Sequence, residues 1–163
     1  MNYIIDGYNV INSSDLFSAN SLEARRNNLI GFVNSKNICG NSKNFVSIVF
    51  DNKTNGIGFS GYDRSFVGSV EVLFSGGMMS ADDIIVEIVD LAQNPYEITV
   101  VTNDKGIKRR IATSGAKTEN VEKFLSRTNK DRNFKKDCIK KLNDDCLAIA
   151  EINEELKELW LKK

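Results

Sequence analysis

Four short apolar segments, each followed by polar or turn-forming residues, constrain this fold more than any other feature. They are residues 3–5, 45–50, 70–74 and 98–101, which read YII, FVSIVF, VEVLF and ITVV. Apolar residues recur at helical spacing between them, at 22–33 and 84–91. Short apolar strands that alternate with helices are typical of a parallel sheet covered on both faces. We therefore predict an α/β fold in which right-handed crossovers bring the carboxyl ends of all strands to one edge, where ligands bind.

Local signals give further predictions. Ser21 is placed to cap the first helix, and Ser80 with Asp83 forms the pattern of a capping box for the helix over 84–91. Residues 105–112 predict a basic helix, and Thr118 is expected to cap the helix that follows it. Residues 52–69 contain four glycines without lasting periodicity, which predicts a mobile surface loop.

The length of 163 residues fits one domain, with 133–163 expected as a helical C-terminal extension packed on it. Apolar runs are interrupted by charge well before the roughly 20 residues that a membrane span needs. The N-terminal residues lack the pattern of a secretory signal. We therefore expect a cytoplasmic protein without a membrane partner, while the oligomeric state stays open.

The chain contains no histidine, and this excludes several kinds of hydrolytic site. A Ser-His-Asp triad, a histidine general base and a histidine-ligated zinc or iron site are all ruled out. The three cysteines, Cys39, Cys138 and Cys146, lack the close CxxC spacing of thiolate metal sites. Small buried hydrophobic residues are the better interpretation of these cysteines.

Charge is unevenly distributed although the net charge is zero. Residues 1–104 carry six basic and twelve acidic side chains, whereas residues 105–141 carry thirteen basic and four acidic ones. A metal-dependent enzyme that acts on a polyanion needs one region to hold cations and another to hold phosphates. A solvated, lysine-rich helix face explains the basic segment equally well.

Aspartates stand where the predicted strands end. Asp6, Asp51 and Asp104 follow three of the strands directly or within a short turn, and Asp82 begins the helix after another. Two carboxylates about 4 Å apart repel by roughly 4 kcal/mol at an effective dielectric constant of 20, so such a cluster needs a counterion or raised pKa values. An oxygen-only site of this kind suits Mg²⁺ or Mn²⁺, which would lower the pKa of a bound water and stabilise charge on phosphorus.

Each aspartate also has a structural interpretation. Asp51 is placed to form an Asx-turn, Asp104 to cap the next helix, and Asp83 to complete the capping box. No helix is evident directly after Asp6, which favours a functional role there. The shared position at strand ends favours a functional role for Asp82 and Asp104 as well.

The same segments carry a family resemblance. It rests on the run from Tyr3 to Val10 (YIIDGYNV), Arg26 to Leu29 (RNNL), Val49 to Asp51 (VFD), the Val70–Phe74 strand with Ala81-Asp82, and Val100 to Asp104 (VVTND). These motifs resemble the NYN domain of the YacP-like group, a branch of the PIN-like ribonucleases, in order over about the first 125 residues.

The resemblance implies a three-layer α/β/α Rossmann-like sandwich, a mainly parallel sheet and metal-dependent endoribonuclease activity. Asp6, Asp82 and Asp104 match the acidic metal ligands, and Asn9 matches a polar residue that orients metal or phosphate. Asp51 matches a position that acts through water or supports Asp6. The family's usual Thr-Ser-Asp is Thr-Asn-Asp here, and Asp83 replaces a commoner serine, which leaves the number of metal ions open. Bacterial relatives act on translated messages at the ribosome, so kinship extends that expectation to this chain.

Candidate RNA contacts lie in two places. Lys105, Lys108, Arg109 and Arg110 follow Asp104 directly and are placed to bind flanking phosphates. In the glycine-rich segment, Tyr62 and Arg64 have the composition of a surface that stacks unpaired bases, although Tyr62 fits the core equally well.

Three functions therefore compete. A Mg²⁺- or Mn²⁺-dependent endoribonuclease is preferred. A non-catalytic RNA- or ribosome-binding module of the same fold is the alternative, although carboxylates facing phosphates would not help a binder. A small-molecule phosphohydrolase that uses the same strand-end acids is the third.

Overall fold

A computed structural model describes residues 2–35, 39, 44–51, 61–76 and 79–127. All of them fall within the first of two compact units, which ends at Thr128. The helical extension predicted for 133–163 lies outside the described residues, so the single-domain interpretation stays a prediction. Within the described part of the chain, no helix has the length and apolar character needed to cross a membrane.

Six strands form one sheet in the order β3-β4-β2-β1-β5-β6. The strands are β1 (Asn2–Asp6), β2 (Phe45–Phe50), β3 (Gly61–Val67), β4 (Val70–Gly76), β5 (Ile98–Val101) and β6 (Lys117–Glu119). Every neighbouring pair is parallel except β3 and β4, which are antiparallel. The predicted mainly parallel sheet is confirmed.

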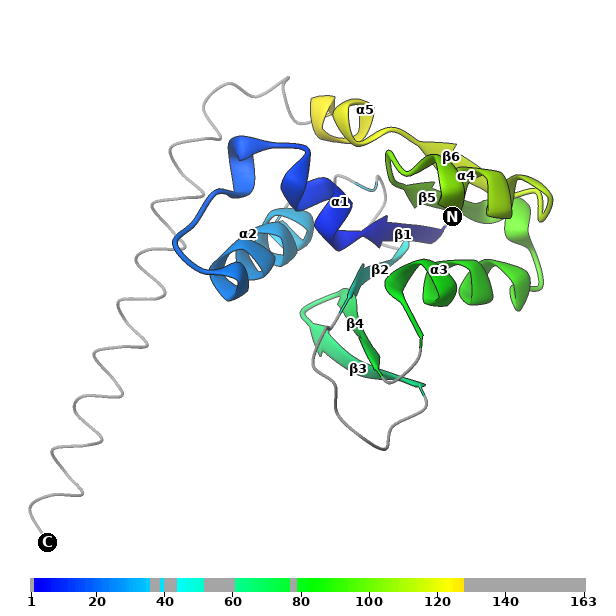
Figure 1. The fold of residues 1–163 in the computed structure, drawn as a ribbon, viewed down its shortest axis with the longest axis horizontal. Coiled ribbons are helices and arrows are strands. Elements are labelled where there is room, and N and C mark those ends of the chain that lie inside the picture. The colour runs from blue at the N-terminus through cyan, green and yellow to red at the C-terminus, as the bar shows by residue number, and fades with distance from the viewer. Residues whose placement is uncertain (1, 36–38, 40–43, 52–60, 77–78, 128–163) are drawn as a thin grey trace, which may run out of the picture. The chain divides into compact units, whose positions relative to one another are not determined.

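Helices cover the sheet on both faces (Figure 1). They are α1 (Gly7–Asn12), α2 (Leu22–Ser35), α3 (Ala81–Asp90), α4 (Lys105–Ala112) and α5 (Val121–Ser126), with short 3₁₀ turns η1 (Asp15–Phe17) and η2 (Pro95–Glu97). Figure 1 shows α1 and α2 on one side of the central strands and α3 on the other.

Strand periodicity explains the two layers. Ile4, Val49 and Leu73 face α3 and α4, with which they form one buried cluster. The next residue along β2, Phe50, points to the opposite face, as the alternation of side chains along a strand requires. There its ring packs edge-on against Tyr8 of α1, with centroids 5.4 Å apart. The chain is thus a three-layer α/β/α sandwich, as expected.

Three local predictions are wrong. Residues 61–67 are not a loop: they form the edge strand β3, which joins β4 through a tight turn at Gly68, where φ is +61°. A helix does begin directly after Asp6, because the Asp6 carboxylate caps α1. Thr118 lies in β6, and the following helix begins after Asn120 instead. Residues 52–60 of the predicted loop lie outside the described residues.

The predicted helix caps at Ser21 and Ser80 are confirmed. The Ser21 hydroxyl accepts a hydrogen bond from the backbone N–H of Ala24 at 3.0 Å. Ser80 and Asp83 form a complete capping box at the start of α3. Cys39 is buried and has a free thiol, whereas Cys138 and Cys146 lie outside the described residues.

Candidate active site

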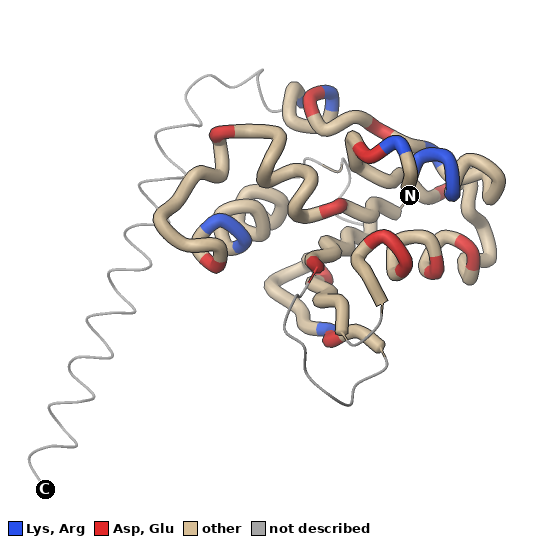
Figure 2. Tube along the Cα trace, in the orientation of Figure 1, with Lys and Arg blue, Asp and Glu red and all other residues tan. Residues whose placement is uncertain are grey.

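A cleft of about 1270 Å³ lies at the carboxyl edge of the sheet. It is bordered by the ends of β1, β2 and β5 and by the first residues of α3 and α4. Four aspartates line it: Asp6, Asp51, Asp82 and Asp104. Figure 2 shows acidic positions where β1 ends and α3 begins, and basic positions along α4. The topology therefore brings together all four acids that the strand ends predicted.

Asp6 is the most enclosed of the four, with 8% of its surface exposed. One carboxylate oxygen, Oδ1, accepts the N–H of Asn9 at 3.1 Å, and Oδ2 accepts the Thr102 hydroxyl at 2.9 Å. Burial raises the pKa of the Asp6 carboxyl, the two hydrogen bonds partly oppose this, and the charges of Asp82 and Asp104 raise it further. The fold therefore holds Asp6 in a fixed orientation at an electrostatic cost.

Asp82 is held by its helix rather than by hydrogen bonds to its carboxylate. It is exposed in the first turn of α3, and its side chain accepts no hydrogen bond from the described residues. Partial burial raises the pKa of the Asp82 carboxyl, and the charge of Asp104 raises it further, while Arg110 opposes the change. Its oxygens are accordingly free to bind a ligand in the cleft.

Asp104 caps α4 with one of its oxygens. Oδ1 accepts the backbone N–H groups of Gly106 at 2.5 Å and Ile107 at 3.0 Å. The hydroxyl of Thr102 accepts the N–H of Asp104 at 3.0 Å and also donates to Asp6. Thr102 thus links two of the acids, a role that sequence reasoning missed. Its place in the TND run directly after β5 was the available signal.

Asp51 is held from the neighbouring strand. The Ser75 hydroxyl of β4 donates to Asp51 Oδ1 at 2.7 Å. The charge of Asp51 contributes to the raised pKa of Asp82. No hydrogen bond joins Asp51 to Asp6 within the described residues, so the predicted support of Asp6 by Asp51 has no direct contact behind it here.

Asn9 presents a hydrogen-bond donor to the cleft. Its Oδ1 accepts the backbone N–H of Asn103 at 2.9 Å, and that donor fixes which end of the amide is the oxygen. The Nδ2 group makes no hydrogen bond to the described residues, and Asn9 lines the cleft. Asn103 in turn accepts the N–H of Val121 and donates to Glu122 at 2.8 Å, so the loop after β5 is tied to α5.

The donor set fits a hard divalent cation. Carboxylate oxygens are the ligands that Mg²⁺ and Mn²⁺ prefer, and the mutual repulsion of Asp6, Asp82 and Asp104 is what such an ion would relieve. In the geometry of the described residues, however, no three acidic side chains stand close enough to hold an ion together. A metal ion held by three of these acids would therefore need their carboxylates to come closer together than they stand in this structure.

The predicted basic contacts separate into two groups. Lys105 lines the cleft. The other basic residues of α4 lie outside its lining: the Lys108 ammonium donates to Asn120 at 2.6 Å, and Arg110 forms an ion pair with Asp83 at 3.0 Å. Arg109 is exposed and has no ion-pair partner among the described residues.

Tyr62 and Arg64 do not line this cleft. Tyr62 packs against the buried cluster of the α3 face. The Arg64 Nε lies 2.7 Å from Oε1 of Glu71, which is buried in β4. Both residues of β3 therefore have structural contacts, and neither lines the cleft that holds the four acids.

Sequence reasoning also missed Tyr8 and Arg26 as lining residues of the cleft. Arg26 donates through both Nε, at 2.8 Å, and Nη2 to the hydroxyl of Tyr8. Both residues lie within the motifs that carried the family resemblance, and that was the only signal for them.

The comparisons with known proteins agree with this fold. The sequence matches the family described as the YacP-like NYN domain over residues 3–162. The structure is similar to the crystal structure of Rae1 (YacP) from Bacillus subtilis, with a TM-score of 0.61, 24% identity, and coverage of 98% of this chain and 92% of that one. A mutant of the same protein gives a TM-score of 0.58 at 22% identity, covering 92% and 83%. No curated protein sequence matches this chain.

Proposed function

Because this chain belongs to the YacP-like NYN domain family, we propose that it is a metal-dependent endoribonuclease that hydrolyses RNA phosphodiester bonds. The observation that carries the proposal is the convergence of Asp6, Asp51, Asp82 and Asp104 on one cleft at the carboxyl edge of a parallel sheet. Elements from separate parts of the chain supply these acids, and independent turns and caps have no reason to point into the same space.

Asp6, Asp82 and Asp104 are the proposed ligands of Mg²⁺ or Mn²⁺. The ion would supply an activated water and stabilise negative charge on phosphorus. Asp51 supports the set through its charge and through its bond to Ser75.

The other lining residues have roles toward the RNA. The Nδ2 group of Asn9 donates toward a phosphate oxygen, because its Oδ1 is engaged by Asn103. Lys105 binds a phosphate that flanks the reacting one, since it lines the cleft directly beside Asp104. Arg109, exposed on the same helix, extends this positive surface.

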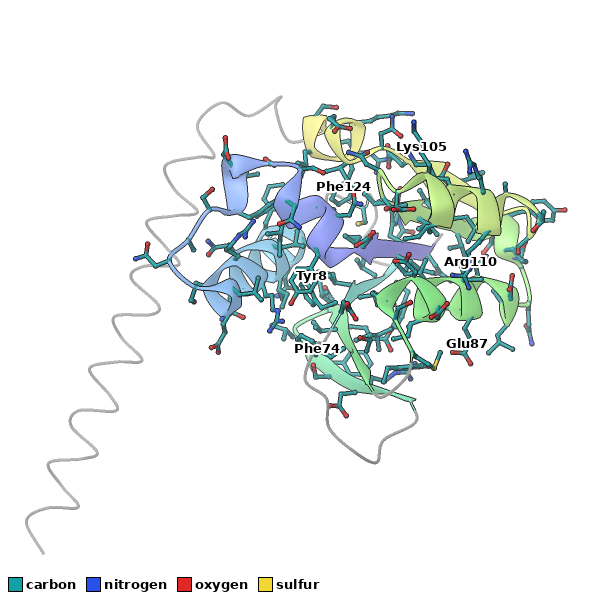
Figure 3. The ribbon with its side chains drawn as sticks, in the orientation of Figure 1. Tyr8, Phe74, Glu87, Lys105, Arg110 and Phe124 are labelled. Atoms are coloured by element: carbon teal, nitrogen blue, oxygen red, sulfur yellow. The ribbon has the colours of Figure 1, made fainter. Side chains whose placement is uncertain are left out.

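The test is cleavage of a labelled single-stranded RNA by the full chain with Mg²⁺, with Mn²⁺ and with EDTA. Asp82→Asn keeps the size of the side chain and removes its charge, so we expect at least about a hundredfold loss of cleavage rate. Glu87→Gln is the matched control, because Glu87 is an exposed carboxylate on the same helix that does not line the cleft. Its position on α3 is labelled in Figure 3.

The outcomes discriminate among the three functions. Equal cleavage by the parent and Asp82→Asn proteins contradicts the proposal. RNA binding without cleavage in any metal supports a non-catalytic binding module instead. Turnover of a chromogenic phosphate ester but not of RNA supports a small-molecule phosphohydrolase.

The family resemblance also supports a finer proposal, that the RNA is a translated message on the ribosome in the cytoplasm. The test is to map cleavage of a reporter message in a translation extract. We expect cleavage of the reporter message to be lost when an antibiotic blocks the initiation of translation. Cleavage of the naked message at the same positions and rate as the translated one would contradict this finer proposal.

A further inference from the structure

Arg26 is held against a cluster of aromatic rings at one wall of the cleft. Its Cζ atom lies 5.3 Å from the ring centroid of Tyr8, 5.8 Å from that of Phe50 and 5.3 Å from that of Phe74. The Phe50 and Phe74 rings are stacked, with centroids 5.5 Å apart and planes inclined by 24°. Contacts of guanidinium with aromatic faces, together with the two hydrogen bonds to Tyr8, fix this side chain before any ligand arrives.

No carboxylate of the described residues forms an ion pair with Arg26. Among the described residues, the ion pairs join Arg64 to Glu71, Arg110 to Asp83 and Arg127 to Glu119, and none involves Arg26. A guanidinium has five N–H donors, and the hydrogen bonds of Arg26 in the described part of the chain use only two, both to Tyr8. A preorganised cation with three unused donors therefore lines the cleft.

Its neighbour Arg25 shows what a structural arginine looks like in the same helix. Arg25 donates to the carbonyl of Ile11 and to the side chain of Asn12, both at 3.2 Å, and it does not line the cleft. Arg26 differs in facing the space that the four aspartates share. Tyr8 and Phe74 lie together in Figure 3, well apart from Lys105 on α4. The two cations that line the cleft, Arg26 on α2 and Lys105 on α4, thus stand on separate elements, and the cleft that they share also holds the four aspartates.

We propose that Arg26 binds a phosphodiester group of the RNA strand, on the α2 side of the acidic centre, with Tyr8 and the two phenylalanines holding its guanidinium in place. This inference rests on the proposed function and adds to it a second anchoring point, on a different element from Lys105. An RNA strand bound by Arg26 at one phosphate and by Lys105 at another would be held in one orientation over the acids. Such positioning would align a single phosphate for in-line attack. Bidentate recognition of phosphate is a task for which the planar guanidinium is suited.

The test measures binding of a short fluorescein-labelled oligouridylate by anisotropy over a range of salt concentrations. All proteins are full-length and carry Asp82→Asn, so that the RNA stays intact, and all contain Mg²⁺. Arg26→Gln is expected to weaken binding about tenfold to a hundredfold, because a charge-assisted contact is lost. The slope of log K against log salt is expected to fall by about 0.7, which corresponds to one phosphate on a single strand.

Two further variants separate binding from support. Tyr8→Phe removes the hydroxyl that accepts from Arg26 but keeps the ring, so we expect the salt slope to stay that of the parent. Lys123→Gln removes one charge from an exposed site on α5 that does not line the cleft, and it is expected to change neither affinity nor slope.

An Arg26→Gln protein that melts earlier but retains the parent salt slope overturns the proposal, because Arg26 would then only brace the aromatic cluster. If Arg26→Gln does not fold, Arg26→Lys decides: it keeps the charge but lacks the planar fork, and unchanged affinity contradicts a bidentate phosphate contact. The result is separable from the proposed function. If RNA cleavage depends on Asp82 but Arg26→Gln leaves the salt slope unchanged, only the proposed role of Arg26 is wrong. If Arg26→Gln lowers the salt slope but the parent protein does not cleave RNA, only the proposed nuclease activity is wrong.

Discussion

Replacing Gly7 with alanine tests whether the turn between β1 and α1 depends on close packing behind the acids. Gly7 is buried between Asp6 and Tyr8. A Cβ atom added there would overlap Cε1 and Cδ1 of the Phe50 ring and would stand 2.9 Å from the carbonyl oxygen of Val49. Gly7 does not have a positive φ, so the requirement for glycine comes from space and not from backbone conformation.

The expected cost follows from what must move. The Phe50 ring is fully buried and stacked on Phe74, so it has little room to retreat. Overpacking a core of this kind costs about 1–3 kcal/mol. For a chain of this length that corresponds to a melting temperature about 3–10 °C lower. Denaturant unfolding of the parent, Gly7→Ala, Phe50→Leu and the double variant measures the cost and its origin.

The double variant makes the prediction specific. A leucine at position 50 vacates the space that the new methyl group needs, so the two changes should compensate each other by about 1 kcal/mol or more. Additive free energies of unfolding, within about 0.5 kcal/mol, would show that the overlap with Phe50 is not the cause. A Gly7→Ala protein as stable as the parent would refute the packing argument altogether.

Three other predictions concern stability and reactivity. Partial burial raises the pKa of Asp82, so its ionised form is disfavoured in the folded state. Without divalent ions, the free energy of unfolding of the parent relative to that of Asp82→Asn should therefore fall as the pH rises from about 4. Saturating Mg²⁺ should reverse this loss of stability in the parent. Urea titrations across pH check this, and a pH-independent difference contradicts it. Burial raises the pKa of the Cys39 thiol to about 12. At pH 8, alkylation of this thiol should therefore be more than about a hundredfold slower in the native than in the unfolded protein, as measured by peptide mapping. Comparable rates in the two states would show that the thiol is accessible. Ser80→Ala removes the acceptor for the N–H of Asp83 and should cost about 1 kcal/mol in denaturant unfolding, whereas an unchanged midpoint would mean that the capping box does not stabilise α3.

The elements that the sequence predicted are those with strong local signals. The parallel strands β2 and β4 are mostly apolar because both of their faces are buried, and α3 has both a capping box and an apolar stripe. The missed elements lack such signals. Most residues of β3 are exposed, and Phe66 has 60% of its surface exposed. The sequence of β3 therefore shows neither a continuous apolar run nor an alternation of apolar and polar residues. β6 has three residues and α1 has six, too few for a periodic pattern.

The candidate site was predictable in part for the same reason. Strand ends can be located from sequence, and parallel topology then brings their aspartates to one edge without knowledge of any contact. The aromatic support of Arg26 was not predictable in this way. Its partners come from α1, β2 and β4, and only the packed structure shows that these rings meet one guanidinium.

The structural contacts of Asp104 and Asp51 do not conflict with the function proposed for them. Asp104 caps α4 through Oδ1 alone, and Asp51 accepts the Ser75 hydroxyl through Oδ1 alone within the described residues. In each case the other carboxylate oxygen, Oδ2, accepts no hydrogen bond from the described residues. A carboxylate fixed by a helix N-terminus loses less conformational entropy on binding an ion than a free side chain does. Under the proposed function, the cap would therefore help to preorganise Asp104 as a metal ligand, whereas Asp82, whose carboxylate accepts no hydrogen bond from the described residues, would be left free to adjust.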